Sequence, residues 1–252
     1  MLPLPSSPRW QGSLQGVVDR ALQEAVALAS GGVHGIIIEN FFDAPFTKDV
    51  VDPAVVSAMT IVVSRLRQVV AIPLGVNVLR NDARSGLAIA ACSGAQFIRV
   101  NVLTGVMATD QGIIEGDAHR LMRYRRELGA DVKVFADVLV KHASPLGTVV
   151  SETAMANAVA DTIHRGLADA VIVSGTATGE PPTNQDLTDA KASAGKAPVL
   201  VGSGATMDNI SKLMQVADGV IVSSSLKRWG QIDQPVDPYR VGLFMEAFPA
   251  NG

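Results

Sequence analysis

The stretch from Pro198 to Lys227, PVLVGSGATMDNISKLMQVADGVIVSSSLK, contains one complete strand–helix–strand unit. A short apolar run ends in Gly202-Ser203-Gly204, a segment with helical spacing follows, and a second apolar run ends in Ser223–Ser225. Both runs are almost continuously apolar rather than alternating, which is typical of parallel strands buried on both faces. The stretch therefore predicts a β-α-β repeat with small polar residues at the carboxyl end of each strand.

The same alternation of strand and helix extends along the whole chain. Apolar runs typical of buried strands occupy Val33–Ile38, Ile72–Val78, Phe97–Val102, Val132–Ala136, Ala170–Val173, Val199–Val201 and Gly219–Val222. Segments with helical spacing occupy Leu14–Ala29, Pro53–Gln68, Ala83–Ser93, Ala118–Leu128, Glu152–His164, Asn184–Ser193, Met207–Gln215 and Pro238–Phe248. No linker-like stretch interrupts the pattern, so we expect residues 1–252 to form a single-domain α/β fold, a (β/α)8 TIM barrel. A doubly wound open sheet is the alternative that the pattern leaves open.

Two places depart from a regular barrel. Only Met1–Leu4 precedes the first helix, so we expect a short or truncated first strand there. After the fourth expected strand, Phe97–Val102, residues 104–117 form an insertion that separates this strand from its helix. Long loops in this position commonly belong to the active-site face of a barrel. We expect a lid or a subunit contact, with a simple surface hairpin as the alternative.

The composition limits the class of partner and the compartment. The chain carries a formal net charge of −3 and no basic block, so nucleic-acid binding is not expected. No apolar run is long enough for a membrane helix, so no integral membrane segment is expected. The one cysteine, Cys92, cannot form an internal disulfide, and we expect it to be a buried structural thiol in a cytoplasmic protein.

Polar and ionisable side chains stand where most of the expected strands end. In a TIM barrel these positions surround the active site, because the strand ends and the loops after them carry the reacting groups. The candidates for acid–base catalysis are Asp137, Glu39, Lys141 and His142. The candidates for substrate binding are Asn77, Arg80, Asn101, Ser174 and Thr176. A barrel with a purely structural role has no need of such a set at one rim, so the pattern predicts a functional site.

Several of these residues could also have a different role. Asp137 could serve only as an ion-pair partner of Arg99. Lys141 could form a Schiff base if it were buried, or it could be a solvated loop residue. A divalent ion held by Glu39, Asp137 and His142 is left open, although no tight ligand spacing supports a metal site. No organic cofactor is indicated.

The small residues after the last two strands predict a phosphate site. Loops in this part of a barrel commonly bind phosphate through backbone N–H groups. The residues that would hold the phosphate are Gly202, Ser203, Gly204, Ser224 and Ser225. Glycine lets the backbone approach an anion closely, and serine hydroxyls add donors. Two tight turns without a ligand are the alternative.

Long stretches of the chain together resemble the BtpA family, the photosystem I biogenesis protein family. They read PLPSSPRW, VHGIIIENFFDAPF, PLGVNVLRNDA, FIRVNVLTGVMATDQGIIEGDAHRLMRYR, FADVLVKHASPL, VSGTATGEPP, PVLVGSGATMDN and ADGVIVSSSLK. The resemblance implies a (β/α)8 barrel akin to phosphate-binding barrels and a role named after photosystem I accumulation in cyanobacteria. Related members occur in organisms without photosynthesis.

Two positions depart from the family pattern. Met1-Leu2 stands where members have a fuller first strand with a histidine before the proline-rich turn. Ser223–Ser225 stands where members have Gly-Thr-Ser. The side chain of Ser223 would therefore narrow or alter the phosphate-binding site.

Two functions of different classes follow from these observations. The first is an enzyme that binds a small phosphorylated, sugar-phosphate-like metabolite for isomerase-, epimerase- or aldolase-type acid–base chemistry. The alternative is a non-catalytic factor in photosystem I biogenesis or complex stability that acts through a surface such as residues 104–117. The ionisable set at the rim favours the enzyme, and an aromatic content of 4% offers little material for an interface. We expect a homo-oligomer in either case.

Overall fold

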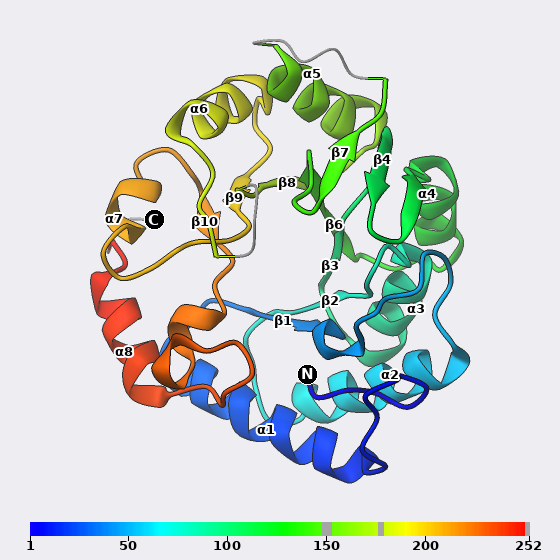
Figure 1. The fold of residues 1–252 in the computed structure, drawn as a ribbon, viewed down its shortest axis with the longest axis vertical. Helices are drawn as coiled ribbons and strands as arrows, with labels where there is room; N and C mark the ends of the chain where they lie inside the picture. Colours follow the sequence, from blue (N-terminus) through cyan, green and yellow to red (C-terminus); the bar gives the residue numbers. More distant parts are fainter. Residues whose placement is uncertain (148–152, 176–178, 250–252) are drawn as a thin grey trace. The chain divides into compact units, whose positions relative to one another are not determined.

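The computed structural model describes residues 1–147, 153–175 and 179–249 (Figure 1). By their internal contacts these residues divide into two compact units. The first unit contains Met1–Val100 and His119–Val134, and the second contains Asn101–Ala118 and the described part of Phe135–Gly252. In each unit, short parallel strands alternate with helices, which is the expected α/β class.

The first unit has a parallel sheet with the strand order β1-β2-β3. Its elements are α1 (Leu14–Ser30), β1 (Ile36–Glu39), the 3-10 turn η1 (Phe41–Asp43), α2 (Pro53–Arg67), β2 (Leu74–Asn77), α3 (Ala83–Ser93), β3 (Phe97–Val100) and α4 (Ala118–Glu127). Every residue of β2 is buried, as the continuously apolar run predicts. Gly75 in β2 lies beneath the Phe97 ring, where a Cβ atom would come within 2.1 Å of the ring.

The second unit has a parallel sheet with the strand order β6-β8-β9-β10. The strands are β6 (Lys133–Val138), β8 (Ala170–Val173), β9 (Val199–Val201) and β10 (Gly219–Val220). The helices are α5 (Ala154–Ala160) with the π-helical turn η2 (Asp161–Arg165), α6 (Asn184–Ser193), α7 (Ile210–Leu213), the 3-10 turns η3 (Ser224–Leu226) and η4 (Arg228–Gly230), and α8 (Pro238–Ala247). All of β8 is fully buried, so this strand lies in the core of the unit.

The insertion between β3 and α4 contains the strands β4 (Val106–Thr109) and β5 (Gly112–Glu115). Together with β7 (Ala143–Pro145), which follows β6, they form a small antiparallel sheet in the order β5-β4-β7. They share an apolar cluster made of Val102, Met107, Ile114 and Val140. The insertion is therefore a hairpin that is held by backbone pairing to the segment after β6.

Met1–Leu4, where a first strand was expected, forms no strand. Leu4 is fully buried, but its N–H donates to Oδ1 of Asp43 at 2.8 Å. A side-chain carboxylate thus takes the hydrogen bond that a neighbouring strand would otherwise accept. Among the described residues, the alternation of elements therefore begins with α1 and not with a strand.

The helix expected over Met207–Gln215 is shorter in the structure, because α7 covers only Ile210–Leu213. The side chain of Asn209 accounts for the late start. Its Oδ1 accepts from the N–H of Thr206 at 2.8 Å, and its Nδ2 donates to the carbonyl of Gly204 at 2.8 Å. The side chain thereby closes a turn over residues that would otherwise form the first helical turn.

The prediction that Cys92 is buried is wrong, since this thiol is exposed. Ile89, Ala90 and Ser93 of the same helix are buried and form its inward face. Cys92 lies outside that face, so its side chain is exposed to solvent. Over the described part of the chain, no helix has the length and apolar character needed to cross a membrane.

Candidate functional site

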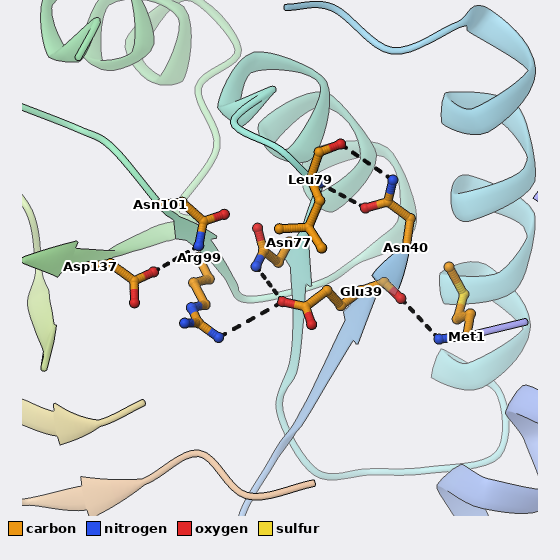
Figure 2. A network of polar contacts seen from close by, with 8 residues as sticks. All are labelled: Met1, Glu39, Asn40, Asn77, Leu79, Arg99, Asn101 and Asp137. Atoms are coloured by element: carbon orange, nitrogen blue, oxygen red, sulfur yellow. Dashed lines mark hydrogen bonds and ion pairs between the residues drawn. The ribbon is translucent and has the colours of Figure 1, made fainter. Parts of the chain in front are cut away.

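Three polar side chains meet at the carboxyl end of the first unit's sheet. Glu39 ends β1 and is the register partner of Asn77, which ends β2. The Nδ2 atom of Asn77 donates to Oε1 of Glu39 at 2.5 Å, and Nη1 of Arg99 lies 3.8 Å from the same oxygen. Figure 2 shows both side chains pointing at the Glu39 carboxylate. The parallel register therefore brings together residues that are far apart in the sequence.

Arg99 is more deeply buried than the Glu39 carboxylate that it faces. The Arg99 side chain is 6% exposed, whereas that of Glu39 is 26% exposed. A buried guanidinium requires an anionic or carbonyl partner, and Glu39 supplies one. The second carboxylate oxygen of Glu39 has no hydrogen bond within the described ranges. One oxygen is thus held by the protein, and the other can accept a proton or a hydrogen bond from a ligand.

Arg99 was not among the expected site residues, although the sequence contains a signal for it. It is the charged residue in the otherwise apolar strand sequence FIRV. A charge inside a buried strand calls for a buried partner. Which partner it takes depends on strand pairing, and that cannot be inferred from the strand itself.

A second network fixes the loop that follows β2. Asn40 is 2% exposed; its Oδ1 accepts from the N–H of Leu79 at 2.7 Å and its Nδ2 lies 3.4 Å from the Leu79 carbonyl oxygen (Figure 2). The same Nδ2 lies 3.2 Å from Oδ2 of Asp43. Asn40 therefore holds both backbone polar groups of the residue before Arg80, to which Leu79 is joined by a cis peptide bond.

Asp43 links this network to the amino-terminal segment. Burial raises the pKa of its carboxyl from the ordinary value of 3.8, against the lowering effect of hydrogen bonds from the Leu4 N–H and the Asn40 amide. Arg80, expected to bind substrate, is 7% exposed. Its backbone N–H donates to the backbone carbonyl of Thr47 at 3.4 Å. The loop is thus anchored on several sides.

In the second unit, Asn101 and Asp137 form a buried polar pair. Asp137 lies in β6 and is 5% exposed, and Asn101 is 4% exposed. The Nδ2 atom of Asn101 donates to Oδ2 of Asp137 at 3.0 Å (Figure 2). The structure thus pairs two of the expected site residues within this unit.

The other expected catalytic residues lie in the turn that leads into β7. Lys141 is half-buried, whereas His142 is exposed and has a left-handed backbone with φ of 57°. The part of the chain that the structure describes contains no group of three His, Cys, Asp or Glu side chains placed to hold a metal ion. Metal binding therefore gains no support from the placement of these side chains.

The loop after β9 packs closely against the loop after β8. A Cβ atom on Gly204 would lie 2.1 Å from the backbone nitrogen of Pro181, and φ at Gly204 is 77°. The hydroxyl of Ser203 donates to the carbonyl of Glu180 at 2.9 Å. These contacts explain why glycine stands at position 204 and serine at position 203 without any need for a ligand.

The same loop also retains donors for an anion. The backbone N–H groups of Ser203, Gly204 and Ser224 donate to no acceptor in residues 1–147, 153–175 and 179–249. The hydroxyl of Ser225 donates to the carbonyl of Ala205 at 2.7 Å, so it contributes as an acceptor or not at all. Thr176, expected to bind substrate, lies outside the described residues. The phosphate site stays a prediction, resting on backbone donors more than on hydroxyls.

Comparison with solved structures agrees with the fold. N-(5'-phosphoribosyl)anthranilate isomerase from Pyrococcus furiosus superimposes with a TM-score of 0.58 over 90% of this chain and 94% of that one, at 17% identity. The native KDPGal structure gives a TM-score of 0.54 over 91% of this chain and 88% of that one, at 16% identity. The chain therefore has a TIM-barrel-like α/β fold.

Sequence comparison identifies the family. The chain is 64% identical over 247 residues to the photosystem I biogenesis protein BtpA of Synechocystis, covering 98% of this chain and 85% of that protein. It is 45% identical to an uncharacterized protein of Thermococcus kodakarensis, covering 97% of this chain and 90% of that protein. The family model described as the BtpA family matches residues 1–250. The chain belongs to the BtpA family.

Proposed function

We propose that the protein is an enzyme that binds a small phosphorylated metabolite and performs isomerase-, epimerase- or aldolase-type acid–base chemistry. The observation that carries the proposal is the cluster of Glu39, Asn77 and Arg99 at the carboxyl end of β1–β3. In a TIM-barrel-like fold this end of the strands is where catalytic groups lie. In this cluster Oε1 of Glu39 is held by its neighbours, whereas Oε2 has no hydrogen bond within the described ranges. A proton-transfer residue needs such a combination of fixed orientation and an available oxygen.

Glu39 acts as the proton acceptor in this proposal. Asn77 and Arg99 hold Oε1, so the carboxylate keeps one orientation while Oε2 takes the proton from the substrate. The proton leaves a carbon next to a carbonyl and returns to a neighbouring carbon in an isomerisation or to the same carbon in an epimerisation. Within the second unit, Asp137 is a separate candidate for acid–base chemistry, and its hydrogen bond from Asn101 fixes its orientation.

The phosphate of the substrate is held by the loop after β9. The supporting observation is the set of unengaged backbone N–H groups at Ser203, Gly204 and Ser224. Backbone donors bind phosphate oxygens without the conformational entropy that long cationic side chains lose. We further propose that the protein works as a homo-oligomer in the cytoplasm, without nucleic acid as a partner.

A non-catalytic role in photosystem I biogenesis is the second candidate. One observation favours it, namely the 64% identity to a protein named for that process. Trp229 and Tyr239 are exposed at 76% and 73%, so the surface does offer aromatic side chains to a partner. Those residues do not account for the anchored carboxylate at Glu39.

A thermal-shift screen tests the proposal. The purified protein is heated with inorganic phosphate, sugar phosphates and nucleotides, each with and without Mg2+, and with the unphosphorylated sugars as controls. A ligand present at about a hundred times its Kd stabilises the folded state by roughly 2.7 kcal/mol, which gives a clear rise in Tm. A rise with phosphorylated compounds alone supports the proposal. No rise with any of them overturns it and favours the biogenesis factor.

A further inference from the structure

Three buried side-chain atoms have no hydrogen-bond partner in the described part of the chain: Oδ1 of Asn101, Oγ of Ser174 and Oε1 of Gln111. Gln111 lies in the turn between β4 and β5, whereas Asn101 and Ser174 directly follow the parallel strands β3 and β8. A buried polar atom without a partner costs free energy, so native proteins rarely retain one without a compensating role. Because the carboxyl ends of parallel strands carry the functional groups of such folds, Oδ1 of Asn101 and Oγ of Ser174 are candidates for contacts with a ligand.

The orientation of the Asn101 amide is set by its neighbour. Nδ2 donates to Oδ2 of Asp137 at 3.0 Å, and Figure 2 shows the amide oxygen on the side away from that carboxylate. Turning the amide over would bring its oxygen against a carboxylate oxygen, which puts two acceptors together. Asp137 consequently fixes the amide so that Oδ1 of Asn101 is an acceptor directed away from the Asp137 carboxylate.

Ser174 lies on the same face of the sheet as Asp137. Asp137 is the register partner of Ile172, and side chains two residues apart along a strand share a face. A Cβ atom on Gly202 would lie 2.3 Å from Oγ of Ser174 and 2.6 Å from Cγ2 of Ile172, which places both side chains on that side. The absence of a side chain at Gly202 is what makes room for the Ser174 hydroxyl.

We infer that these two atoms bind hydroxyl groups of the ligand, and that the substrate is polyhydroxylated. One ligand hydroxyl donates to Oδ1 of Asn101, and another exchanges a hydrogen bond with Oγ of Ser174. A site with buried polar groups discriminates strongly against an analogue that lacks the matching hydroxyl, because the protein groups then stay unpaired. The inference rests on the proposed function and narrows it to sugar phosphates as opposed to phosphorylated keto acids.

An organic donor fits these atoms better than a metal ion does. A hard divalent cation takes six or more oxygen ligands from carboxylates, carbonyl groups and waters. The pair offers one carboxylate and one amide oxygen, and the described ranges contain no cluster of three metal-binding side chains. Ser174 can donate as well as accept, which suits a ligand hydroxyl that also does both.

Stability without ligand is the first test. Ser174→Ala removes a buried hydroxyl that has no partner, so its Tm in the absence of ligand should equal or exceed that of the wild type. Ser203→Ala is the matched control, because the hydroxyl of Ser203 is buried in a loop and donates to the carbonyl of Glu180 at 2.9 Å. In the absence of ligand the control should lower Tm, because this hydrogen bond is lost. An equal loss of Tm in both variants would mean that the Ser174 hydroxyl is structural and would overturn the inference.

Binding is the second test, by calorimetry with ribose 5-phosphate, fructose 6-phosphate, their deoxy analogues, phosphoenolpyruvate, inorganic phosphate and free ribose. We expect at least one sugar phosphate to bind about tenfold or more tightly than its deoxy analogue. Ser174→Ala or Asn101→Ala should remove that preference while inorganic phosphate still binds. If Asn101→Ala does not fold, Ser174→Ala alone decides.

The outcomes separate the two proposals. Sugar phosphates that bind no better than their deoxy analogues and phosphoenolpyruvate would overturn the inference and leave the proposed function standing. Binding of free ribose that depends on Ser174, with no binding of any phosphorylated compound, would overturn the proposed function and support the hydroxyl site. Failure of every compound to bind would overturn both.

Discussion

The Nδ2 atom of Asn77 lies 2.5 Å from Oε1 of Glu39, its register partner on the neighbouring parallel strand. This contact joins residues 38 positions apart and orients the one carboxylate of the cluster at the end of β1–β3.

Replacing the Glu39 carboxylate tests its role in proton transfer. Glu39→Gln keeps an oxygen that can accept from Asn77 but cannot take a proton. Turnover of a substrate found in the ligand screen should fall by about 10²–10⁴-fold, the usual contribution of a general base. The control is Glu24→Gln on α1, where the carboxylate pairs with Arg20. Equal activity of the two variants would remove Glu39 from the mechanism.

Removal of the Asn40 amide tests the anchor of the loop after β2. Asn40→Ala leaves the Leu79 N–H without its acceptor and Asp43 without one donor. We expect a loss of about 2–4 kcal/mol in the free energy of unfolding, because these groups are buried. Urea unfolding measures it. Asn157→Ala, at an exposed position of α5, should change stability by less than about 0.5 kcal/mol. A similar effect at both positions would contradict the anchoring role.

The raised pKa of Asp43 predicts an unusual pH dependence of stability. Because burial favours its protonated form, the native state binds more protons than the unfolded chain just above pH 3.8. The free energy of unfolding should therefore carry a contribution from Asp43 that decreases as pH rises from 3.8 through the raised pKa. Asp43→Asn abolishes that contribution, so the variant should gain stability relative to the wild type as pH rises.

Asp131 provides a comparison, because its pKa is shifted in the opposite direction to that of Asp43. A hydrogen bond from Lys133 lowers the pKa of this exposed carboxyl. Its contribution to stability is present above pH 3.8 and is lost as pH falls through the lowered pKa. Unfolding curves at stepped pH should show Asp43→Asn gaining and Asp131→Asn losing stability relative to the wild type as pH rises. Parallel behaviour of Asp43→Asn and the wild type would contradict the burial effect.

Gly204 tests the close packing of the loops after β8 and β9. Gly204→Ala places a Cβ atom 2.1 Å from the backbone of Pro181 at a φ of 77°. Strain at positive φ and overpacking together should cost about 2–5 kcal/mol. Gly32→Ala is the matched control, since φ there is 88° but nothing lies within 4 Å of the added atom. That variant should lose only about 1–2 kcal/mol. Equal losses would show that the packing contributes nothing.

Much of the fold could be predicted from local sequence signals. The bounds of α3 and α6 match the expected Ala83–Ser93 and Asn184–Ser193, because N-caps at Asp82 and Thr183 mark where each helix begins. The apolar runs located the parallel strands because burial on both faces excludes polar residues. The weakness of the first strand was also expected: Met1–Leu4 forms no strand, and the N–H of Leu4 donates to the Asp43 carboxylate instead of to a neighbouring strand.

The candidate site was only partly predictable. Strand ends in a parallel sheet point to one edge, so Glu39, Asn77, Asn101 and Asp137 could be selected from the sequence alone. Asn40 and Arg99 were missed as site residues because their importance lies in what they contact. The glycines after β9 were recognised as special, but the close contact with Pro181 could not be foreseen.

The sequence by itself determined the α/β class, the order of strands and helices and the family, because helix caps, apolar periodicity and long shared motifs are local properties of the chain. Only the tertiary structure decided which side chains pair. Asn77 holds Glu39, Asn40 holds Leu79, and Asn101 holds Asp137 across 36 to 39 positions. Strand register sets such contacts, and register arises from the packing of the whole sheet, so no single segment encodes it.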